Sequence, residues 1–567
     1  MHKQNENKQN ANLKQNINVK QNVNVKQNAN VKQNINIKQN ANVKQNINIK
    51  QNLSIKKNDE FETDIIDYGS DGEGIAKIDG YTIFVKGALK GEKCKIHITK
   101  VLQTHAFANV TQIIKKSPNR KESDCATFPR CGGCTLRHIN YEETLKIKQE
   151  KVQNLFDKSF KKGSIKVEQT VGMEKPFYYR NKAIYPIRQD KKVGIYASRS
   201  HNVVPINECK IQTIQSQEIA KYIIENWEDT IYDEKTGKGL LRNIMIRESF
   251  TTGEVMCVLV QNGTENLKIN EKSSNKKTNN NNRNQYNDSK NEKESNKGKI
   301  TSPNLEYNLI DSNSEYNLIN SNSKYNLINS NLINNLVKKF PKIKTIIINV
   351  NKKNTNVVLS SDNIVVYGSG YITDVLGGYK FRISPNSFYQ VNPIQTEKIY
   401  KMAIEKANLN ENDVMCDLYC GIGTIGIFAS KYVKKVYGIE IVPQAIMDAK
   451  ENARINNIKN IEFIEGNVED AFDKLLNNKN GKNEISKNDK PNAVIVDPPR
   501  KGLDSTTIQN LKKLKLEKLV YVSCNPATLV RDLKDLSEVY EIKEVIPIDN
   551  FCFSSHVETI ATLKLKN

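Results

Sequence analysis

The sequence lacks any continuous apolar stretch of the roughly eighteen residues that a membrane-spanning helix requires. The N-terminal segment MHKQNENKQN also lacks the apolar core of a secretion signal. We therefore expect a cytoplasmic protein without a membrane partner. Because thiols stay reduced in that compartment, the ten cysteines indicate metal ligands, catalytic groups or packed thiols rather than a disulfide framework.

Acidic residues are too few to balance the basic ones. The 567 residues include 86 Lys and Arg against 63 Asp and Glu, a formal net charge of +23. Residues 1–57 contain eleven Lys and one Glu, so they supply +10 and leave +13 for the rest of the chain. This excess favours a polyanionic partner such as RNA, although charge predicts association rather than fold or reaction. We predict no obligate protein partner.

Three tracts have too few apolar residues to build a core. Residues 1–57 repeat K-Q-N-x-N-x with a period of six, residues 263–336 are rich in Asn, Lys and Ser, and a shorter tract lies near 477–491. We expect a disordered tail and disordered inserts. Lengthening a loop from ~8 to ~70 residues costs only about 2 kcal/mol, so the central tract can interrupt a folded domain.

The remaining sequence predicts a multidomain protein of three parts. In residues 58–116, short β-branched runs alternate with glycine turns, which is typical of a small OB-like β-barrel. Residues 117–262 and 337–375 predict a central β-rich domain that carries a cysteine cluster. Residues 376–567 alternate strands and helices from about residue 411, which predicts a Rossmann-like α/β sheet that ends in a β-hairpin.

A glycine-rich turn follows the first predicted strand of the α/β domain, in Asp417–Gly426 (DLYCGIGTIG). Glu440 ends the next strand, nineteen residues after Gly421. Glycines let a cofactor approach the backbone, and an acidic side chain at the second strand end accepts hydrogen bonds from ribose hydroxyls. The pattern predicts a nucleoside-cofactor site and by itself leaves NAD possible.

Two later motifs discriminate between cofactors. Asp497–Arg500 (DPPR) and Ser523–Pro526 (SCNP) lie at the carboxyl ends of predicted strands, where an open α/β sheet binds its ligands. A nicotinamide enzyme has no need of a cysteine there. Methylation of C5 of uracil does need one, because a thiolate must add to C6 before C5 becomes nucleophilic, and a base must then remove the C5 proton. The alternative for Cys524 is a buried thiol at a strand end.

Four other cysteines are spaced like metal ligands. Cys125, Cys131 and Cys134 form C-x5-C-x2-C, and Cys209 follows. Three thiols within ten residues can converge on one metal centre, but spacing alone does not separate zinc from iron, and unligated core cysteines remain an alternative. The remaining five are expected to pack as small hydrophobes: Cys94, Cys257, Cys416, Cys420 and Cys552.

Taken together, DLYCGIGT, DPPRKGLD, LVYVSCNPATLVRDL, SFYQVN and SSHVETIATL resemble the RNA uracil-5 methyltransferase family, in the branch with a TRAM domain and an iron-sulfur cluster. The resemblance covers about residues 60–567 apart from the low-complexity inserts. It implies methylation of C5 of a uridine in structured RNA from S-adenosylmethionine, with 23S rRNA as the preferred target and tRNA as the alternative.

The resemblance also implies roles for individual residues. Cys524 would be the nucleophile and Glu558 the base that takes the C5 proton. A 4Fe-4S cluster would be held by Cys125, Cys131, Cys134 and Cys209. S-adenosylmethionine would be bound by Gln390, Tyr419, Glu440, Asn467 and Asp497.

The segment Phe177–Lys182 (FYYRNK), with Arg188 and Arg199, could stack on bases and pair with phosphates. A solvated β surface is the competing interpretation. In the resembling family this middle region binds a folded RNA, and the target uracil must leave its stack to reach a thiolate at the sheet edge. A non-catalytic iron-sulfur RNA-binding protein is the alternative from another class, but it would not need Cys524, Glu558 and Gln390 together.

Overall fold

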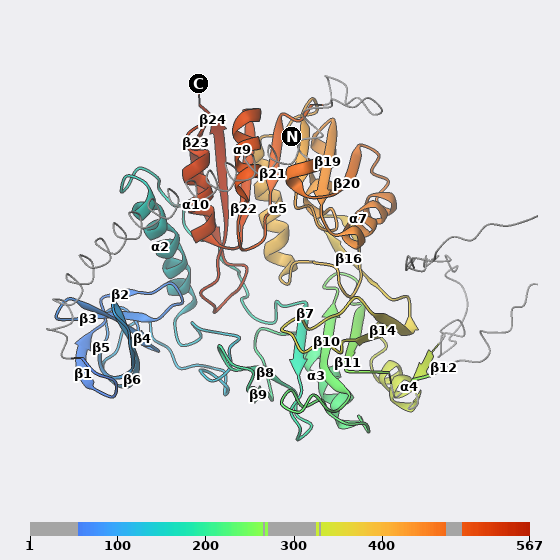
Figure 1. The fold of residues 1–567 in the computed structure, drawn as a ribbon, viewed down its shortest axis with the longest axis horizontal. Helices are drawn as coiled ribbons and strands as arrows, with labels where there is room; N and C mark the ends of the chain where they lie inside the picture. Colours follow the sequence, from blue (N-terminus) through green and yellow to red (C-terminus); the bar gives the residue numbers. More distant parts are fainter. Residues whose placement is uncertain (1–54, 265–266, 270–324, 328–329, 472–489, 567) are drawn as a thin grey trace, which may run out of the picture. The chain divides into compact units, whose positions relative to one another are not determined.

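The computed structural model describes residues 55–264, 267–269, 325–327, 330–471 and 490–566, shown in Figure 1. The predicted disordered tail up to residue 54, most of the central insert and most of the tract near 477–491 lie outside these described residues. The chain divides into two compact units, one formed by residues up to Gly69 with Glu73–Pro118 and the other by Ser70–Gly72 with Asn119 onward. Within the described ranges, no helix is long and apolar enough to cross a membrane.

The first unit is a six-stranded β domain in the order β1-β5-β6-β4-β3-β2. Alternate residues of its strands point into one core, as Ile83 and Val85 do in β4 and Ile96 and Ile98 in β5. Ile55, the first described residue, is buried in the same core. This confirms the predicted N-terminal β domain. The strands are β1 (Glu60–Asp64), β2 (Asp67–Tyr68), β3 (Gly74–Ile78), β4 (Tyr81–Lys86), β5 (Lys93–Val101) and β6 (His105–Lys115).

The second unit contains a five-stranded central sheet in the order β15-β14-β11-β10-β7. Helix α3 (Ile214–Glu225) and helix α4 (Ser330–Lys339) share a core with one face of this sheet. Two short strands, β8 (Gly194–Tyr196) and β9 (Val203–Pro205), pair beside it. The sheet confirms the predicted β-rich central part. Its strands are β7 (Lys182–Pro186), β10 (Leu241–Glu248), β11 (Val255–Gln261), β14 (Ile343–Val350) and β15 (Asn363–Gly368).

Helix α4 corrects one boundary. It begins at Ser330, inside the tract 263–336 that the sequence assigns to a disordered insert. Its apolar residues recur at helical spacing and are buried, although they stand among repeated Asn-Leu-Ile segments whose composition is that of the insert. They are Leu332, Ile333, Leu336 and Val337.

The α/β part of the second unit is built on a seven-stranded sheet in the order β20-β19-β18-β21-β22-β24-β23. Strands β18 to β22 are parallel, and β24 runs antiparallel between β22 and β23. Their continuous apolar runs fit a sheet buried on both faces. The strands are β18 (Val414–Leu418), β19 (Lys435–Glu440), β20 (Ile461–Glu465), β21 (Ala493–Val496), β22 (Lys518–Ser523), β23 (Tyr540–Ile548) and β24 (Glu558–Leu565).

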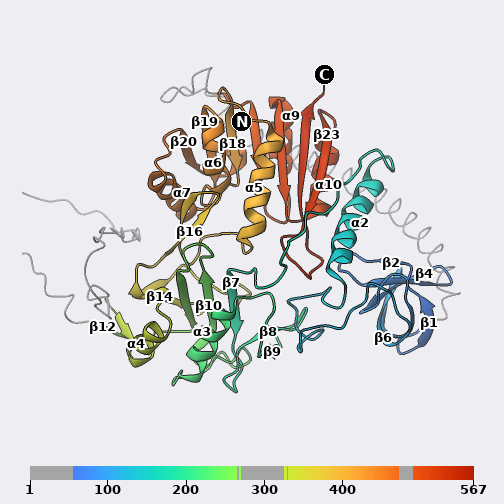
Figure 2. The ribbon, with the colours of Figure 1, turned by 180° about the vertical axis from the view of Figure 1, so that it is seen from behind.

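Helices cover both faces of this sheet, as Figures 1 and 2 show from opposite sides. One face packs against α5 (Pro393–Ala407) and α6 (Thr424–Ala429). The other face packs against α9 (Ser505–Leu514), α10 (Pro526–Leu536) and α2 (Tyr141–Ser159). The arrangement confirms the predicted Rossmann-like α/β architecture with a terminal hairpin. The boundary near residue 375 between the central and α/β domains stays a prediction.

The strand order reverses between β18 and β21, because β19 and β20 lie on one side of β18 and the later strands on the other. At such a reversal, the connections from the two central strands diverge and open a crevice at the carboxyl ends of the strands. The glycine-rich turn follows β18, and DPPR follows β21. The fold therefore brings both motifs to one edge of the sheet.

Candidate active site

Cys524 and Glu558 lie opposite each other at the carboxyl edge of the α/β sheet. Ser523, the last residue of β22, pairs with Thr559 of the antiparallel β24, so the next two residues, Cys524 and Glu558, face each other across the strands. The charge of Glu558 contributes to raising the pKa of Cys524, which places the two groups within electrostatic reach. The strand pairing thus joins the predicted nucleophile and the predicted base.

Asp497 and Arg500 share the surroundings of this pair, and we define Cys524, Glu558, Asp497 and Arg500 as the candidate cluster. Burial raises the pKa of Glu558 to about 8, with a further contribution from Asp497, whose own pKa burial raises to about 7. Burial, Glu558 and Asp497 raise the pKa of Cys524 to about 11. The Arg500 cation lowers the pKa of both Cys524 and Glu558.

The cluster has the groups that nucleophilic and general-base chemistry require. Glu558 is only 2% exposed, and a carboxyl with a pKa near neutrality is suited to taking a proton from a bound substrate. Cys524 is half-buried, and Arg500 favours its thiolate form. Asn525 ties the two loops together, because its Nδ2 donates to the Arg500 carbonyl at 3.0 Å.

Two residues of this region have no role in the sequence prediction. Arg500 stands in DPPR and could have been noted as a cation next to a strand end. Asn550 has no recognisable motif around it. It lies in the loop between β23 and β24, and the fold of this hairpin brings it close to Glu558. The side chain of Asn550 is fully buried, and its hydrogen bond to Glu558 lowers the pKa of that carboxyl.

The glycine-rich turn borders open space at Gly421. Gly421 has φ +56°, and a Cβ atom added there would meet nothing within 4 Å, so the backbone borders open space. Glu440 accepts hydrogen bonds from the amides of Gly421 (3.1 Å) and Val442 (2.9 Å), and each carboxylate oxygen keeps a lone pair for a ribose hydroxyl. Asp417, at the end of β18, accepts the amide of Gly426 at 2.7 Å and fixes the turn into α6.

Other predicted cofactor residues are distributed around this loop. Asn467 is exposed, and the preceding amide of Gly466 donates to the Glu440 carbonyl at 3.0 Å, which places Asn467 near Glu440. Two apolar side chains that follow Glu440 are solvent-exposed, Ile441 (59%) and Val442 (49%), and offer an apolar surface to a base.

Tyr419 and Gln390 are placed differently. The ring of Tyr419 packs against the core that α9 and α10 share, and its backbone has φ +66°. Gln390 lies on the loop before α5, where Asn181 donates to its carbonyl at 3.1 Å. The structure thus groups Glu440, the glycine loop and Asn467, while Gln390 belongs to a separate loop.

The four candidate metal ligands line one cavity. Cys125, Cys131, Cys134 and Cys209 all border it. Burial raises the pKa of Cys134 to about 12 and also raises the pKa of Cys131 and Cys209. Within the ranges that the structure describes, no group of three or more His, Cys, Asp or Glu side chains is arranged to hold a metal ion. The other five cysteines are buried, as expected: Cys94, Cys257, Cys416, Cys420 and Cys552.

Segment 177–182 is divided between buried and exposed side chains, and its binding of RNA stays a prediction. Tyr179 is buried and donates to the Cys552 carbonyl at 3.2 Å. Asn181 is buried, and Lys182 lies within β7, where burial and the neighbouring Arg247 lower its pKa to about 7. Phe177 is 39% exposed. Lys182 begins β7, and burial alternates along the residues that lead into this strand, with Tyr179 and Asn181 buried and Arg180 partly exposed.

The two isolated arginines form ion pairs on the surface. Arg188 pairs with Asp190 at 2.9 Å, and Arg199 pairs with Asp71 at 2.7 Å. Both pairs are solvent-exposed, so a phosphate can compete for either arginine.

Comparisons with known proteins identify relatives for both ends of the chain. The TRAM domain family matches residues 56–111, and the tRNA (Uracil-5-)-methyltransferase family matches residues 324–566. An uncharacterized RNA methyltransferase of Clostridium acetobutylicum is 40% identical over 515 residues, which cover 89% of this chain and 97% of that protein. One of Halalkalibacterium halodurans is 36% identical over 516 residues, covering 90% and 98%.

A solved structure shares the fold over most of the chain. It is the tRNA (uracil-54, C5)-methyltransferase of Pyrococcus abyssi in complex with S-adenosyl-L-homocysteine. The match has a TM-score of 0.62 at 26% sequence identity and covers 88% of this chain and 99% of that one. With the TRAM domain at one end and the catalytic sheet at the other, the chain belongs to the RNA uracil-5 methyltransferase family and is an S-adenosylmethionine-dependent RNA methyltransferase.

Proposed function

We propose that this enzyme methylates C5 of a specific uridine in structured RNA through a covalent bond between Cys524 and C6. The observation that carries the proposal is the pairing of β22 with β24, which sets the half-buried Cys524 opposite the buried carboxyl of Glu558. Asp497 and Arg500 share the electrostatic environment of both groups. A non-catalytic RNA-binding protein would have no use for this arrangement.

Each catalytic residue has one step. The Cys524 thiol loses its proton to water, and its sulfur forms a bond to C6 while the C5=C6 electrons move toward O4. S-adenosylmethionine, when bound, would supply an electrophilic methyl group for C5, and its methyl–sulfur bond would break to leave neutral S-adenosylhomocysteine. Glu558 then accepts the C5 proton, the C–H electrons restore the C5=C6 bond, and the C6–S bond breaks to release the thiolate of Cys524.

The glycine loop fits S-adenosylmethionine. The open space beside Gly421 accommodates a ligand close to the backbone, and Glu440 keeps lone pairs for ribose hydroxyls. We assign cofactor binding to Gln390, Tyr419, Glu440, Asn467 and Asp497.

The RNA target follows from the resemblance to enzymes with a TRAM domain and a cysteine cluster, and 23S rRNA is the proposed substrate. The basic balance of the chain and the TRAM domain support an RNA partner. A tRNA is the second candidate, because the Pyrococcus abyssi relative is a tRNA methyltransferase. In either RNA the uridine must flip out of its stack to reach Cys524.

We further propose that Cys125, Cys131, Cys134 and Cys209 hold a 4Fe-4S cluster. All four border one cavity, and each would bind a different iron, so their sulfurs need not converge on a single point. Burial disfavours the free thiolates, and a bound metal would reverse this because it requires the deprotonated form.

Tritium release tests the function. RNA that carries 5-tritiated uridine is incubated with the enzyme, with and without S-adenosylmethionine, and we expect donor-dependent release of tritium into water. In vitro transcripts of 23S rRNA and tRNA, tested in parallel, distinguish the two targets. Methyl transfer without tritium release would contradict chemistry at C5.

A further inference from the structure

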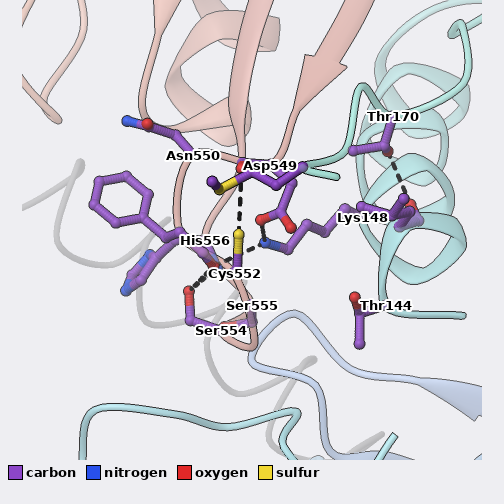
Figure 3. Close-up of polar contacts among 12 residues, drawn as sticks. Thr144, Lys148, Thr170, Asp549, Asn550, Cys552, Ser554, Ser555 and His556 are labelled. Carbon is purple, nitrogen blue, oxygen red and sulfur yellow. Dashed lines mark hydrogen bonds and ion pairs between the residues drawn. The ribbon is translucent and has the colours of Figure 1, made fainter. Parts of the chain in front are cut away.

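The loop Asp549–Val557 joins β23 to β24 and leads directly into Glu558; we call it the base loop. Helix α2 holds its first part. Lys148 and Asp549 are both fully buried and form an ion pair, and the Lys148 ammonium also donates to the Phe551 carbonyl at 3.0 Å (Figure 3). The Tyr141 hydroxyl donates to the other oxygen of Asp549 at 2.6 Å.

The segment that follows Cys134 holds the middle of the base loop. The amides of Thr135 and Leu136 both donate to the Phe553 carbonyl, each at 2.9 Å. The Thr135 hydroxyl accepts the amide of Ser555 at 3.1 Å. Phe553 has φ +61°, a left-handed conformation that is unfavourable for a residue with a bulky side chain. These contacts therefore maintain a loop conformation that Phe553 would not adopt by itself.

Arg137 connects the middle of the base loop to the segment that carries Cys125, Cys131 and Cys134. Its guanidinium lies over the Phe553 ring, 4.3 Å from the ring centre, and is only 1% exposed. The same guanidinium makes a bidentate pair with Asp124, with Nε–Oδ1 and Nη2–Oδ2 distances of 2.6 and 2.8 Å. Asp124 directly precedes Cys125. The pair thus closes the segment that contains Cys125, Cys131 and Cys134, and its cation rests on the base loop.

We propose that Arg137 is a positioning residue that aims Glu558: through Phe553, the segment Asp124–Arg137 fixes the base loop and thereby governs removal of the C5 proton. The inference rests on the proposed function. Cys524 follows β22 and leads into α10, outside the base loop, so a loosened loop should leave formation of the C6–S bond nearly intact. Release of the methylated RNA, which needs Glu558, should slow.

The test compares Arg137→Met with Arg137→Lys in the full-length protein. Arg137→Met keeps the side-chain length without the cation, whereas Arg137→Lys retains a cation over Phe553. With methyl-labelled donor and RNA, denaturing gels measure the covalent complex against released product. We expect Arg137→Met to raise the ratio of complex to product by about tenfold or more, and Arg137→Lys to restore most of the difference. Adduct formation should change by less than about threefold.

The readouts separate this role from general damage. Iron content reports whether the cysteine segment is intact, and circular dichroism reports whether the protein is folded. Arg454→Met is the matched control, because Arg454 is exposed and forms an ion pair with Glu451. If Arg137→Met does not fold, Asp124→Asn tests the same link by freeing the guanidinium. An unchanged ratio, or an equal loss of both steps, would overturn the proposal.

Glu558→Gln distinguishes this proposal from the proposed function. If Glu558→Gln accumulates a methylated complex and Arg137→Met does not, only the positioning role fails. If neither the wild type nor Glu558→Gln ever forms a covalent complex with RNA, the proposed function itself fails.

Discussion

Cys524 and Cys134 differ less in thiol acidity than in the groups around them. Burial raises the pKa of Cys524 to about 11 and that of Cys134 to about 12, and an arginine lowers each, Arg500 in one case and Arg137 in the other. The neighbours of Cys524 are two carboxyls, whereas Cys134 is surrounded by other cysteines whose charges raise its pKa further. A single thiolate among proton acceptors suits a transient bond to a substrate, while several thiolates together need a metal. The neighbouring groups, more than the acidity of the thiol, distinguish the site of Cys524 from that of Cys134.

The largest effect is expected from Cys524→Ala. Without the thiol, no bond to C6 can form, so neither a covalent complex nor methylated RNA should be detected with methyl-labelled donor on a denaturing gel. Cys257→Ala is the matched control, because Cys257 is buried in β11 of the central sheet and should retain turnover. A labelled slow-migrating band from Cys524→Ala would show that another residue is the nucleophile.

Glu558→Gln should stop the reaction later, at the elimination that releases Cys524. After methyl transfer, C5 still carries its proton, and without the base the C6–S bond does not break. We expect a methylated protein–RNA complex that is stable on a denaturing gel, with little released product. Glu541→Gln, a change at an exposed glutamate of β23, is the control. Normal turnover by Glu558→Gln would assign the base elsewhere.

The cysteine cavity provides the other half of the comparison. Protein purified without oxygen should be brown and contain about four iron and four sulfide ions per chain, since four cysteines line the cavity. Cys134→Ser should lower the iron content, while Cys524→Ala should leave it unchanged. Stoichiometric zinc without visible absorbance would contradict the iron-sulfur cluster. The cavity and the Cys524 site would then differ only in the reactivity of their thiols.

A smaller effect is expected from Arg500→Gln. Because Arg500 lowers the pKa of Cys524, its removal should decrease the thiolate fraction at neutral pH and slow covalent complex formation by about tenfold for each unit of pKa. Raising the pH should recover part of the rate. Lys501→Gln, at the neighbouring exposed position, should have little effect on the rate. A rate that is equally low at every pH would show that Arg500 acts by another route.

The smallest effect concerns stability. Burial raises the pKa of Glu558 from 4.5 to about 8, so the folded state favours the protonated carboxyl. This contribution to stability is fully present below about pH 4.5 and is lost as the pH rises to about 8. Glu558→Gln is neutral throughout, so its unfolding temperature should exceed that of the wild type by about 2 °C or more at high pH and by little at low pH. Differential scanning fluorimetry across this range measures the difference, and a constant difference would contradict the buried, uncharged state.

Local sequence patterns were sufficient to predict the helices and strands that have a clear periodicity of apolar residues. The alternation of apolar runs and helical segments predicted the α/β sheet, and glycine turns between β-branched runs predicted the N-terminal β domain. The motifs around Cys524 and Glu558 also marked residues that the structure sets face to face. Helix α4 was missed because its apolar spacing lies within a repetitive, Asn-rich tract.

Residue identity and short-range periodicity were enough to single out Cys524 and Glu558 as the proposed catalytic pair, and to predict the order of strands and helices. They also marked the four cysteines that line one cavity. The folded structure was needed to show that Asn550 lies beside Glu558, that Tyr179 is buried, and that Arg137 packs on Phe553. Lys148 and Asp549 are 401 residues apart in the chain and form a direct, fully buried ion pair. Such pairs depend on the position of β24 between β22 and β23 and on the packing of α2 against the sheet. These long-range contacts produce no periodic pattern in the sequence, so the sequence does not predict them.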